Sequence, residues 1–418
     1  MKNKIIKIFI LFLILILLLN YRYTFADDNE IDNDKPITEN EINEIYTVET
    51  SNNNTSNLNL NARSCIVLDR LSKKIIYGKK EYNKVKMAST TKIMTAIIVI
   101  ENYDLNKTIQ VSKKAASTGG SRLGLKAGDK ITVNDLLYGL MLCSGNDAAV
   151  ALAETVGESI QGFSNLMNEK AKKLGLNNTH FESPHGLDSD QHYTTAYELA
   201  LLTNYALNNS TFLNIVGTKR YTVTINGNPK NLINTNELLG ILNGIYGVKT
   251  GFTNGANRCL VTACKRGNID VICVVLGCDT KKFRTQDSIK LIEYTFKNFE
   301  YINIEELINK KIDDWKNNNQ NYFEVKKGIS SDIKLKISKL SNPIIPINKN
   351  DINSIKTEIV VNKTLNAPVM QNDIIGKIEV TCKDEQIVCL DIFADNTINK
   401  KGIFDYLRDL GTFFPSLF

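Results

Sequence analysis

Three short polar motifs constrain the fold of this chain more than any other feature of its sequence. In chain order they are Ser89-Thr90-Thr91-Lys92, Ser144-Gly145-Asn146 and Lys249-Thr250-Gly251. None of them is informative alone, because a serine three residues before a lysine is common on solvated helix faces. As a set, they supply hydroxyl, amine and amide groups that a fold would have to bring together from three distant segments.

The residues after the first motif are typical of a helix with one apolar face. Apolar side chains recur there at helical spacing: Ile93, Ala96, Ile97 and Ile100. On such a helix Ser89 and Lys92 lie on one face, with their Cβ atoms about 5 to 6 Å apart. A serine hydroxyl needs a positioned base, and a lysine is a base only where burial or a nearby cation lowers its pKa. We therefore interpret Ser89 as a candidate nucleophile and Lys92 as its base, with Lys249 as the second positive charge.

The second motif is predicted to lie on a tight corner between two helices. Thr132, with Asp135 three residues later, resembles a capping box at the start of a helix. Ser144-Gly145-Asn146 interrupts the apolar pattern of that helix, and a second helix is predicted over 147–156. On this corner Ser144 would offer a hydroxyl for proton relay and Asn146 an amide to hold a substrate backbone.

The third motif is predicted to lie on a strand. Residues 248–253, 258–263 and 271–276 are strand-like and separated by Gly and Asn turns, as in successive antiparallel strands. A hairpin over 64–77 precedes them, and further helices are predicted over 194–207 and 285–299. The chain is thus predicted to have an α/β fold, in which an antiparallel sheet is flanked by helices and joined to a helical subdomain.

With these elements in place, the ordered motifs resemble those of the serine D-Ala-D-Ala carboxypeptidases, the low-molecular-mass penicillin-binding proteins of the peptidase S11 family, whose fold is also that of the β-lactamases. The resemblance covers residues 60–300 and is carried by four stretches, 87–95, 135–149, 184–187 and 247–253. It implies a D,D-peptidase catalytic domain over 62–300.

The resemblance also implies roles for the site residues. Ser89 would be the nucleophile, Lys92 its base and Ser144 a proton relay. The residues implied in substrate binding are Asn146, Lys249, Thr250, Gly251, Phe252 and Arg284, of which Phe252 would share the oxyanion hole with the Ser89 amide. Arg284 matches an arginine proposed to meet the substrate carboxylate, although a surface arginine at a helix start would need no such role.

The implied reaction removes the terminal D-alanine from a peptidoglycan stem pentapeptide through an acyl-enzyme on Ser89. A β-lactam would acylate the same serine, and no metal or organic cofactor is required. The alternatives are a β-lactamase of the same fold, a transpeptidase, and a catalytically silent penicillin-sensing or wall-binding protein. No Glu-x-x-Leu-Asn segment, typical of class A β-lactamases, follows Ser144, and no motif residue is missing as in a silent relative.

After residue 300 the spacing of apolar residues changes. Short runs with period-two alternation over 301–394 predict a small all-β domain, which resembles the C-terminal domain of the same family. Residues 400–418 predict an amphipathic helix whose apolar side carries Ile403, Phe404, Tyr406, Leu407, Leu410, Phe413 and Phe414. Such a helix either packs on the β domain or lies in a membrane interface, and we expect a membrane anchor.

The N-terminal end predicts export. Lysines, an apolar run and a small-x-small pattern ending at Ala26 are typical of a signal peptide over 1–26, and the apolar run is shorter than the roughly 20 residues of a spanning helix. Residues 27–61 are mostly polar and are predicted to be a disordered linker.

Removal of 1–26 lowers the net charge from +6 to +2, which argues against a nucleic-acid partner. The exported enzyme would act at the outer face of the cytoplasmic membrane or in the cell wall.

Eight cysteines in an exported chain permit disulfides. Cys259, Cys264 and Cys273 lie in apolar runs and are interpreted as core residues. Cys382 and Cys389 flank a predicted hairpin and are the one pair we expect could bond. A zinc site is not expected, because none of the three histidines has a cysteine at ligand spacing.

Overall fold

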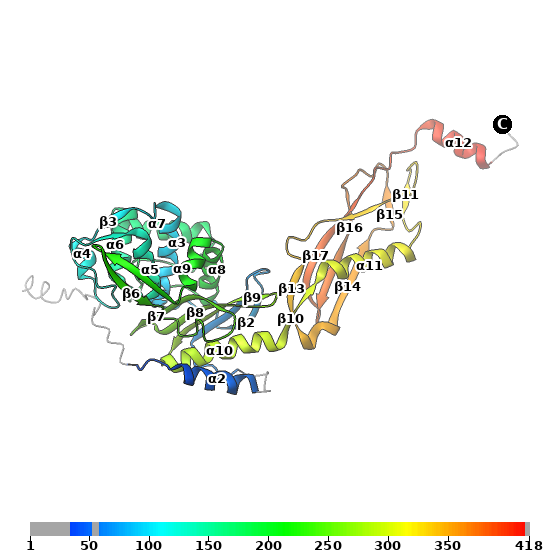
Figure 1. Ribbon diagram of the computed structural model, residues 1–418. Coiled ribbons are helices and arrows are strands. Elements are labelled where there is room, and N and C mark those ends of the chain that lie inside the picture. The colour runs from blue at the N-terminus through cyan, green and yellow to red at the C-terminus, as the bar shows by residue number, and fades with distance from the viewer. Residues whose placement is uncertain (1–33, 52–57, 414–418) are drawn as a thin grey trace, which may run out of the picture. The chain divides into compact units, whose positions relative to one another are not determined.

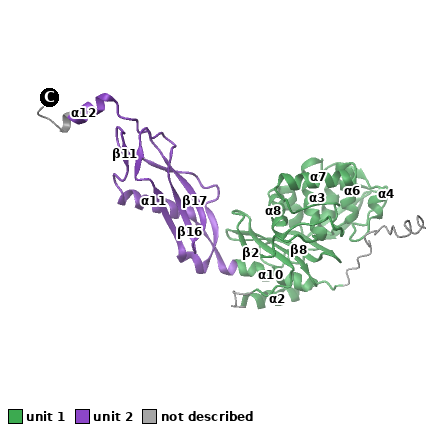
Figure 2. Cartoon of the chain, turned by 180° about the vertical axis from the view of Figure 1, so that it is seen from behind, with its two compact units in different colours: residues 1–295 green, residues 296–418 purple. Residues whose placement is uncertain are grey.

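The structure, a computed structural model, describes residues 34–51 and 58–413. The chain divides into two compact units, residues 1–295 and 296–418 (Figure 2). The signal peptide predicted over 1–26 lies outside the described residues. Each unit has a hydrophobic core of its own.

A five-stranded antiparallel sheet is the centre of the first unit. Its order is β2 (Ile75–Lys79), β1 (Ser64–Asp69), β9 (Ile269–Cys278), β8 (Asn257–Arg266) and β7 (Ile245–Thr253). The predicted hairpin and the three predicted later strands are therefore confirmed. Strand β7, which carries the third motif, is at one edge of this sheet.

Helices cover one face of the sheet and form the subdomain that sequence predicted (Figure 1). They are α3 (Lys92–Asn102), α4 (Lys113–Ser117), α5 (Val133–Leu142), α6 (Asn146–Gly157), α7 (Ile160–Lys173), α8 (Ala196–Leu207) and α9 (Ser210–Gly217). Two small antiparallel strand pairs adjoin them: β3 (Thr108–Gln110) with β4 (Lys130–Thr132), and β5 (Arg220–Ile225) with β6 (Asn228–Ile233). Ile93, Ala96 and Ile97 are fully buried, as the apolar face behind Ser89 predicts.

The other face of the sheet carries α10 (Lys281–Asn298), with α2 (Glu39–Ser51) beside it (Figure 1). Ile289 and Ile292 of α10 are fully buried, which confirms the predicted helix. The prediction of a disordered linker over 27–61 is wrong for residues 39–51. Ile42 and Ile45 are one helical turn apart in α2 and are 1% and 9% exposed, so their burial against the unit stabilises a segment that is otherwise polar.

The second unit is mainly antiparallel sheet, as predicted. Its four-stranded sheet has the order β12 (Leu335–Ile337), β17 (Glu385–Ala394), β16 (Ile374–Cys382), β14 (Ile355–Val361). Two further strand pairs complete it: β10 (Phe299–Asn303) with β13 (Ile344–Asn348), and β11 (Glu324–Lys326) with β15 (Thr364–Asn366).

A helix that was not predicted, α11 (Ile304–Asn318), packs on this β unit. Its buried residues Ile304, Ile308 and Ile312 recur every fourth position, and the Asn303 side chain caps its first turn. This spacing is a helical signal that was overlooked because the neighbouring segments alternate with period two.

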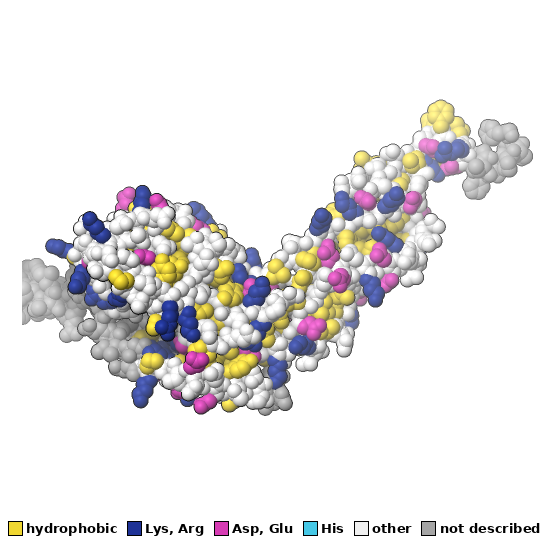
Figure 3. Space-filling view, viewed as in Figure 1, with side chains coloured by type: hydrophobic (Ala, Val, Ile, Leu, Met, Phe, Trp, Pro, Cys, Tyr) yellow, Lys and Arg dark blue, Asp and Glu magenta, His cyan; other side chains and the backbone are white. Residues whose placement is uncertain are grey.

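The last described element is α12 (Ile403–Phe413). Its apolar side chains are exposed in the structure, with Ile403 at 79% and Phe404 at 87%, and Figure 3 shows them gathered on one side of the helix. These exposures contradict the alternative in which this face packs on the β unit. Residues 414–418, which include the predicted apolar Phe414, lie outside the described part of the chain. Among the described helices, none is long and apolar enough to cross a bilayer.

All eight cysteines lie in the described residues and are free thiols. Cys259, Cys264 and Cys273 are at most 1% exposed, which confirms them as core residues. Burial raises the pKa of Cys259 to about 11. Cys382 pairs with Glu385 across the hairpin and Cys389 with Glu379, so the one pair considered for a disulfide is not bonded.

Candidate active site

Ser89 lies on a 3-10 turn, Ala88–Thr91, that leads directly into α3, of which Lys92 is the first residue. In a 3-10 turn side chains three residues apart eclipse one another, which brings Ser89 and Lys92 closer than a regular helix would. The Lys92 Nζ atom is 2.7 Å from the Ser89 Oγ atom. The proximity predicted from the spacing is therefore confirmed, although the turn type was not predicted.

The Lys92 side chain is fully buried. Besides Ser89, its Nζ atom contacts the Asn146 Oδ1 atom at 2.7 Å and the His185 carbonyl oxygen at 3.0 Å. Burial, and next the positive charge of Lys249, hold the pKa of Lys92 well below its usual value, while the charge of Asp147 acts in the opposite direction. A neutral Lys92 amine has a lone pair that can accept the Ser89 proton along the existing contact.

The second motif forms the corner that its sequence predicted. Helix α5 ends at Leu142, Ser144 has a left-handed backbone with φ of 59°, and α6 begins at Asn146. The Asn146 side chain is fixed at both ends, because its Nδ2 atom donates to the Gly119 carbonyl at 2.8 Å and its Oδ1 atom accepts from Lys92. The amide orientation is thus set by a lysine that lies far from it in sequence.

Asp147, the residue after this motif, has a function in the site that sequence reasoning missed. Its buried carboxylate accepts hydrogen bonds of 2.7 to 2.9 Å from three successive main-chain amides, those of Leu123, Gly124 and Leu125. These contacts fix the loop whose neighbouring residues, Gly120 and Ser121, line the pocket described below. An acidic residue in the first turn of a helix is ordinary, so the sequence carries no signal for this contact.

The third motif lies on β7 next to the serine. A Cβ atom built on Gly251 would lie 3.1 Å from the Ser89 amide nitrogen, closer than nearly all real contacts, so glycine permits the strand to approach the turn. Lys249 is 1% exposed and its Nζ atom donates to the Thr250 carbonyl at 2.9 Å. Burial lowers the pKa of Lys249 to about 7.

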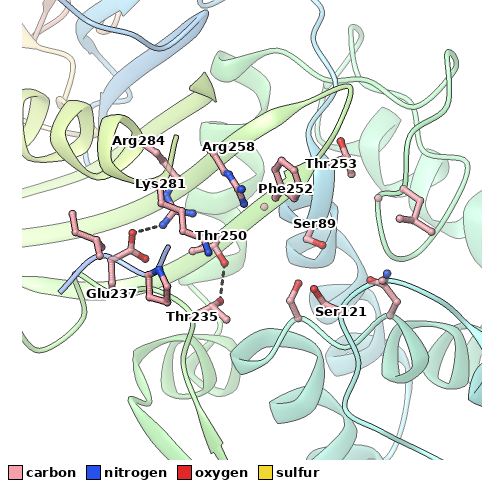
Figure 4. A pocket seen from close by; sticks show the side chains of 18 residues that line it. Ser89, Ser121, Thr235, Glu237, Thr250, Phe252, Thr253, Arg258, Lys281 and Arg284 are labelled. Carbon is pink, nitrogen blue, oxygen red and sulfur yellow. Dashed lines mark hydrogen bonds and ion pairs between the residues drawn. The ribbon is translucent and has the colours of Figure 1, made fainter. Parts of the chain in front are cut away.

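These groups surround a pocket of about 280 Å³ (Figure 4). Of the predicted site residues, those that line it are Ser89, Ser144, Asn146, Thr250, Gly251, Phe252 and Arg284. The buried Lys92 and Lys249 are not among the lining residues. The Thr250 hydroxyl is held by the Thr235 hydroxyl at 2.7 Å. All of the predicted site residues thus belong to one place in the fold. No group of His, Cys, Asp and Glu side chains in the described ranges could hold a metal ion.

Arg284 is not a surface residue. It is 4% exposed, lines the pocket and forms an ion pair with Glu237, which also accepts a hydrogen bond of 2.6 Å from the Thr285 hydroxyl. The reading of Arg284 as an exposed arginine at a helix start is therefore wrong. Its partner Glu237 was not predicted, because nothing in the local sequence marks it.

A loop that contains His185 and His192 packs against the serine turn. A Cβ atom on Gly186, whose φ is 88°, would lie 2.0 Å from the Ala88 carbonyl oxygen, so the loop and the turn meet without space between them. The His192 Nε2 atom is 2.7 Å from the Thr91 hydroxyl. Burial lowers the pKa of His185 to about 3 and that of His192 to about 4, so both rings are neutral near pH 7. These contacts indicate that both histidines are structural residues of the loop.

Comparison with known proteins decides the family. The family model described as D-alanyl-D-alanine carboxypeptidase, peptidase S11, matches residues 50–280, which is more than half of the chain. The chain belongs to the D-alanyl-D-alanine carboxypeptidase family. A second model, the C-terminal domain of penicillin-binding protein 5, matches residues 315–400.

Individual family members agree over most of the chain. The D-alanyl-D-alanine carboxypeptidase DacF of Bacillus subtilis is 33% identical over 85% of this chain and 90% of its own length. The crystal structure of the D-alanyl-D-alanine carboxypeptidase DacD of Francisella tularensis covers 91% of this chain and all of its own, with 26% identity and a TM-score of 0.68. The Streptomyces K15 DD-transpeptidase covers 58% of this chain and 99% of its own, with 35% identity and a TM-score of 0.56. The predicted family and fold are thereby confirmed.

Proposed function

We propose that this D-alanyl-D-alanine carboxypeptidase removes the terminal D-alanine from peptidoglycan stem pentapeptides through an acyl-enzyme on Ser89. The observation that carries the proposal is the contact of 2.7 Å between the Ser89 hydroxyl and the buried amine of Lys92, whose pKa is lowered. A lysine in that state can take a proton at neutral pH, which an exposed lysine cannot.

In the proposed first step the Ser89 Oγ atom attacks the carbonyl carbon between the last two D-alanines, and its proton passes to the Lys92 Nζ atom. The oxygen of the tetrahedral intermediate accepts hydrogen bonds from the main-chain amides of Ser89 and Phe252, which a glycine at 251 allows to lie close together. The carbon–nitrogen bond then breaks, and the leaving amine takes a proton relayed through Ser144. Free D-alanine departs and the peptide remains as an ester on Ser89.

In the second step a water molecule attacks that ester and gives a proton to Lys92. The ester bond to Ser89 breaks, the serine recovers its proton and the shortened peptide leaves as an acid. Asn146 would hold the peptide backbone against the edge strand β7, and Lys249, Thr250 and Arg284 would bind the carboxylate side of the substrate. A β-lactam would form the same ester on Ser89 and hydrolyse slowly.

The assay that tests this proposal is release of D-alanine from a stem pentapeptide by the purified protein. We expect one D-alanine to be released for each pentapeptide consumed, with a tetrapeptide as the other product. No D-alanine should be released from a stem tetrapeptide. Rapid turnover of penicillin without D-alanine release would instead identify a β-lactamase. Transfer of the acyl group to an added amino acid in preference to water would identify a transpeptidase, the activity named for the Streptomyces K15 relative.

We further propose that residues 1–26 direct export, that residues 62–300 form the catalytic domain and that α12 associates with the outer face of the cytoplasmic membrane. The exposed apolar residues of α12 support the last point, because Ile403, Phe404 and Leu407 are each at least half exposed. Burial of such a face in the interface of a bilayer is favourable, and the neighbouring Lys400 and Lys401 suit anionic headgroups.

Liposome flotation tests this attachment. The chain without residues 1–26 is expected to float with vesicles that contain anionic lipid, and the same chain without residues 400–418 is expected to remain in the soluble fraction. A Phe404→Ser variant should float less than a matched variant on the polar side of the helix, Arg408→Gln. Equal flotation of all these proteins would contradict the proposal.

A further inference from the structure

The segment before α2 reaches the active-site pocket. Pro36 and Ile37 are among the residues that line it. Helix α2 holds this segment to the first unit, because Ile42 is 1% exposed and Glu49 forms an ion pair with Lys290 of α10 at 3.7 Å. The N-terminal segment is therefore fixed at one end next to the pocket.

Asp34, at the start of the described segment, is bound by residues of the pocket wall. Its carboxylate lies 3.5 Å from the Nε atom of Arg258 and accepts a hydrogen bond from the main-chain amide of Lys281. The Lys281 Nζ atom donates to the main-chain carbonyl of Asp34 at 2.7 Å. One carboxylate is thus held by a guanidinium and a main-chain N–H group, a combination that suits carboxylates in general.

Arg258 is well placed to bind a carboxylate inside the pocket. It pairs across strands with Phe252, and its guanidinium lies 3.6 Å from the centre of the Phe252 ring. Its side chain is 5% exposed, so its orientation is fixed by packing. Figure 4 shows Arg258 and Lys281 on the same side of the pocket as Arg284, with Ser89 on the other side. Arg284 already has an internal acidic partner from the pocket wall in Glu237, whereas the carboxylate near Arg258 comes from the N-terminal segment.

We propose that Arg258 and Lys281 form a carboxylate-binding subsite of the pocket and that Asp34 occupies it in the free enzyme, so that the N-terminal segment competes with the substrate carboxylate. This inference rests on the proposed function, which supplies a substrate with a carboxylate close to the bond that breaks. An occupant of this kind reduces the fraction of binding-competent enzyme and raises the apparent KM in inverse proportion to that fraction, while kcat is unchanged.

The expected effect is modest, because the Asp34 carboxylate is 27% exposed and water screens its ion pair with Arg258. We expect Asp34→Asn to lower the KM for the stem pentapeptide about fivefold and to leave kcat unchanged. Because salt weakens the ion pairs of Arg258 with Asp34 and with the substrate carboxylate alike, the two proteins are compared at one fixed salt concentration.

The matched control is Glu44→Gln, which removes one negative charge from an exposed position of α2. It is expected to leave both KM and kcat unchanged. Arg258→Gln should raise KM, and Asp34→Asn introduced into that variant should give no further decrease. This coupling distinguishes competition at Arg258 from a general effect of charge.

An unchanged KM in Asp34→Asn, with an unchanged unfolding temperature, would overturn the inference. An equal decrease of KM by Asp34→Asn in the Arg258→Gln background would also overturn it, since the carboxylate would then act elsewhere. If neither the unmodified protein nor any variant releases D-alanine, it is the proposed function that fails. The competition is then tested by the rate of labelling with a penicillin, which carries a carboxylate of its own.

Discussion

Replacement of Ser89 by alanine is expected to abolish covalent labelling by penicillin and to reduce D-alanine release to the background rate. In the proposed mechanism this hydroxyl forms the ester, because it lies 2.7 Å from the Lys92 amine that takes its proton. Removal of a nucleophile that acts together with its base costs on the order of 10⁶ in turnover in other serine hydrolases. The measurement is the stoichiometry of a labelled penicillin on the purified protein, followed by mass spectrometry of the intact chain.

The fold should tolerate this change, because the Ser89 hydroxyl contacts Lys92 but carries little of the packing of the turn. Ser117→Ala, which removes an exposed hydroxyl outside the pocket, is the matched control and should label as fully as the unmodified protein. If the Ser89→Ala protein still carried one penicillin per chain, the ester would have to be on another residue, and the assignment of the nucleophile would be wrong.

Replacement of Lys92 by methionine is expected to slow acylation by about 10³ or more, within the range of general base catalysis. Methionine has a similar length and fills the space of this buried side chain, while the Asn146 and His185 oxygens lose their donor, so we expect the protein to fold with a lowered unfolding temperature. The rate of penicillin labelling under single-turnover conditions measures the effect, and thermal unfolding checks the fold. Lys172→Met, at an exposed position of α7, is the control and should leave the rate unchanged.

The pH dependence of acylation tests the same assignment. Since burial and the charge of Lys249 lower the pKa of Lys92, the amine loses its proton at lower pH than a free lysine, and the acylation rate should rise with pH as it does so. Lys249, whose pKa is lowered to about 7, titrates nearby, so the rising limb describes the pair and not one residue. A rate that falls with pH over this range would argue against a lysine base.

Much of the site could be predicted because each motif has a strong local signal. The periodicity after Ser89 places Lys92 on the same face, the break in apolar pattern at Ser144 gives the corner, and the strand-like run around Lys249 gives the sheet edge. The family resemblance then implies a catalytic or binding role for each of these residues, which their spacing alone does not. Alternation predicts the second unit as β, but it does not predict α11 or the short 3-10 helix at Lys349–Ser354.

The contacts that could not be predicted join residues far apart in sequence. The His185 carbonyl accepts a hydrogen bond from Lys92, and the Glu237 carboxylate forms an ion pair with Arg284. Asp147 fixes a loop more than twenty residues before it. The stretches that carry the family resemblance include His185 and Asp147, but nothing in their local sequence shows which residues they contact. Helix α2 failed as a prediction for a related reason: Ile42 and Ile45 are too few for an amphipathic signal, and their burial depends on tertiary contact.

The two glycines beside the nucleophile also limit how this target could change under antibiotic selection. A Cβ atom on Gly186 would overlap the Ala88 carbonyl, and one on Gly251 would press on the Ser89 amide, so we expect a substitution at either position to lower both D-alanine release and acylation by β-lactams. Ser121 and Thr235 also line the pocket, and each already carries a side chain there. Substitutions that lower acylation by a β-lactam but keep D-alanine release are therefore expected at pocket positions other than these two glycines.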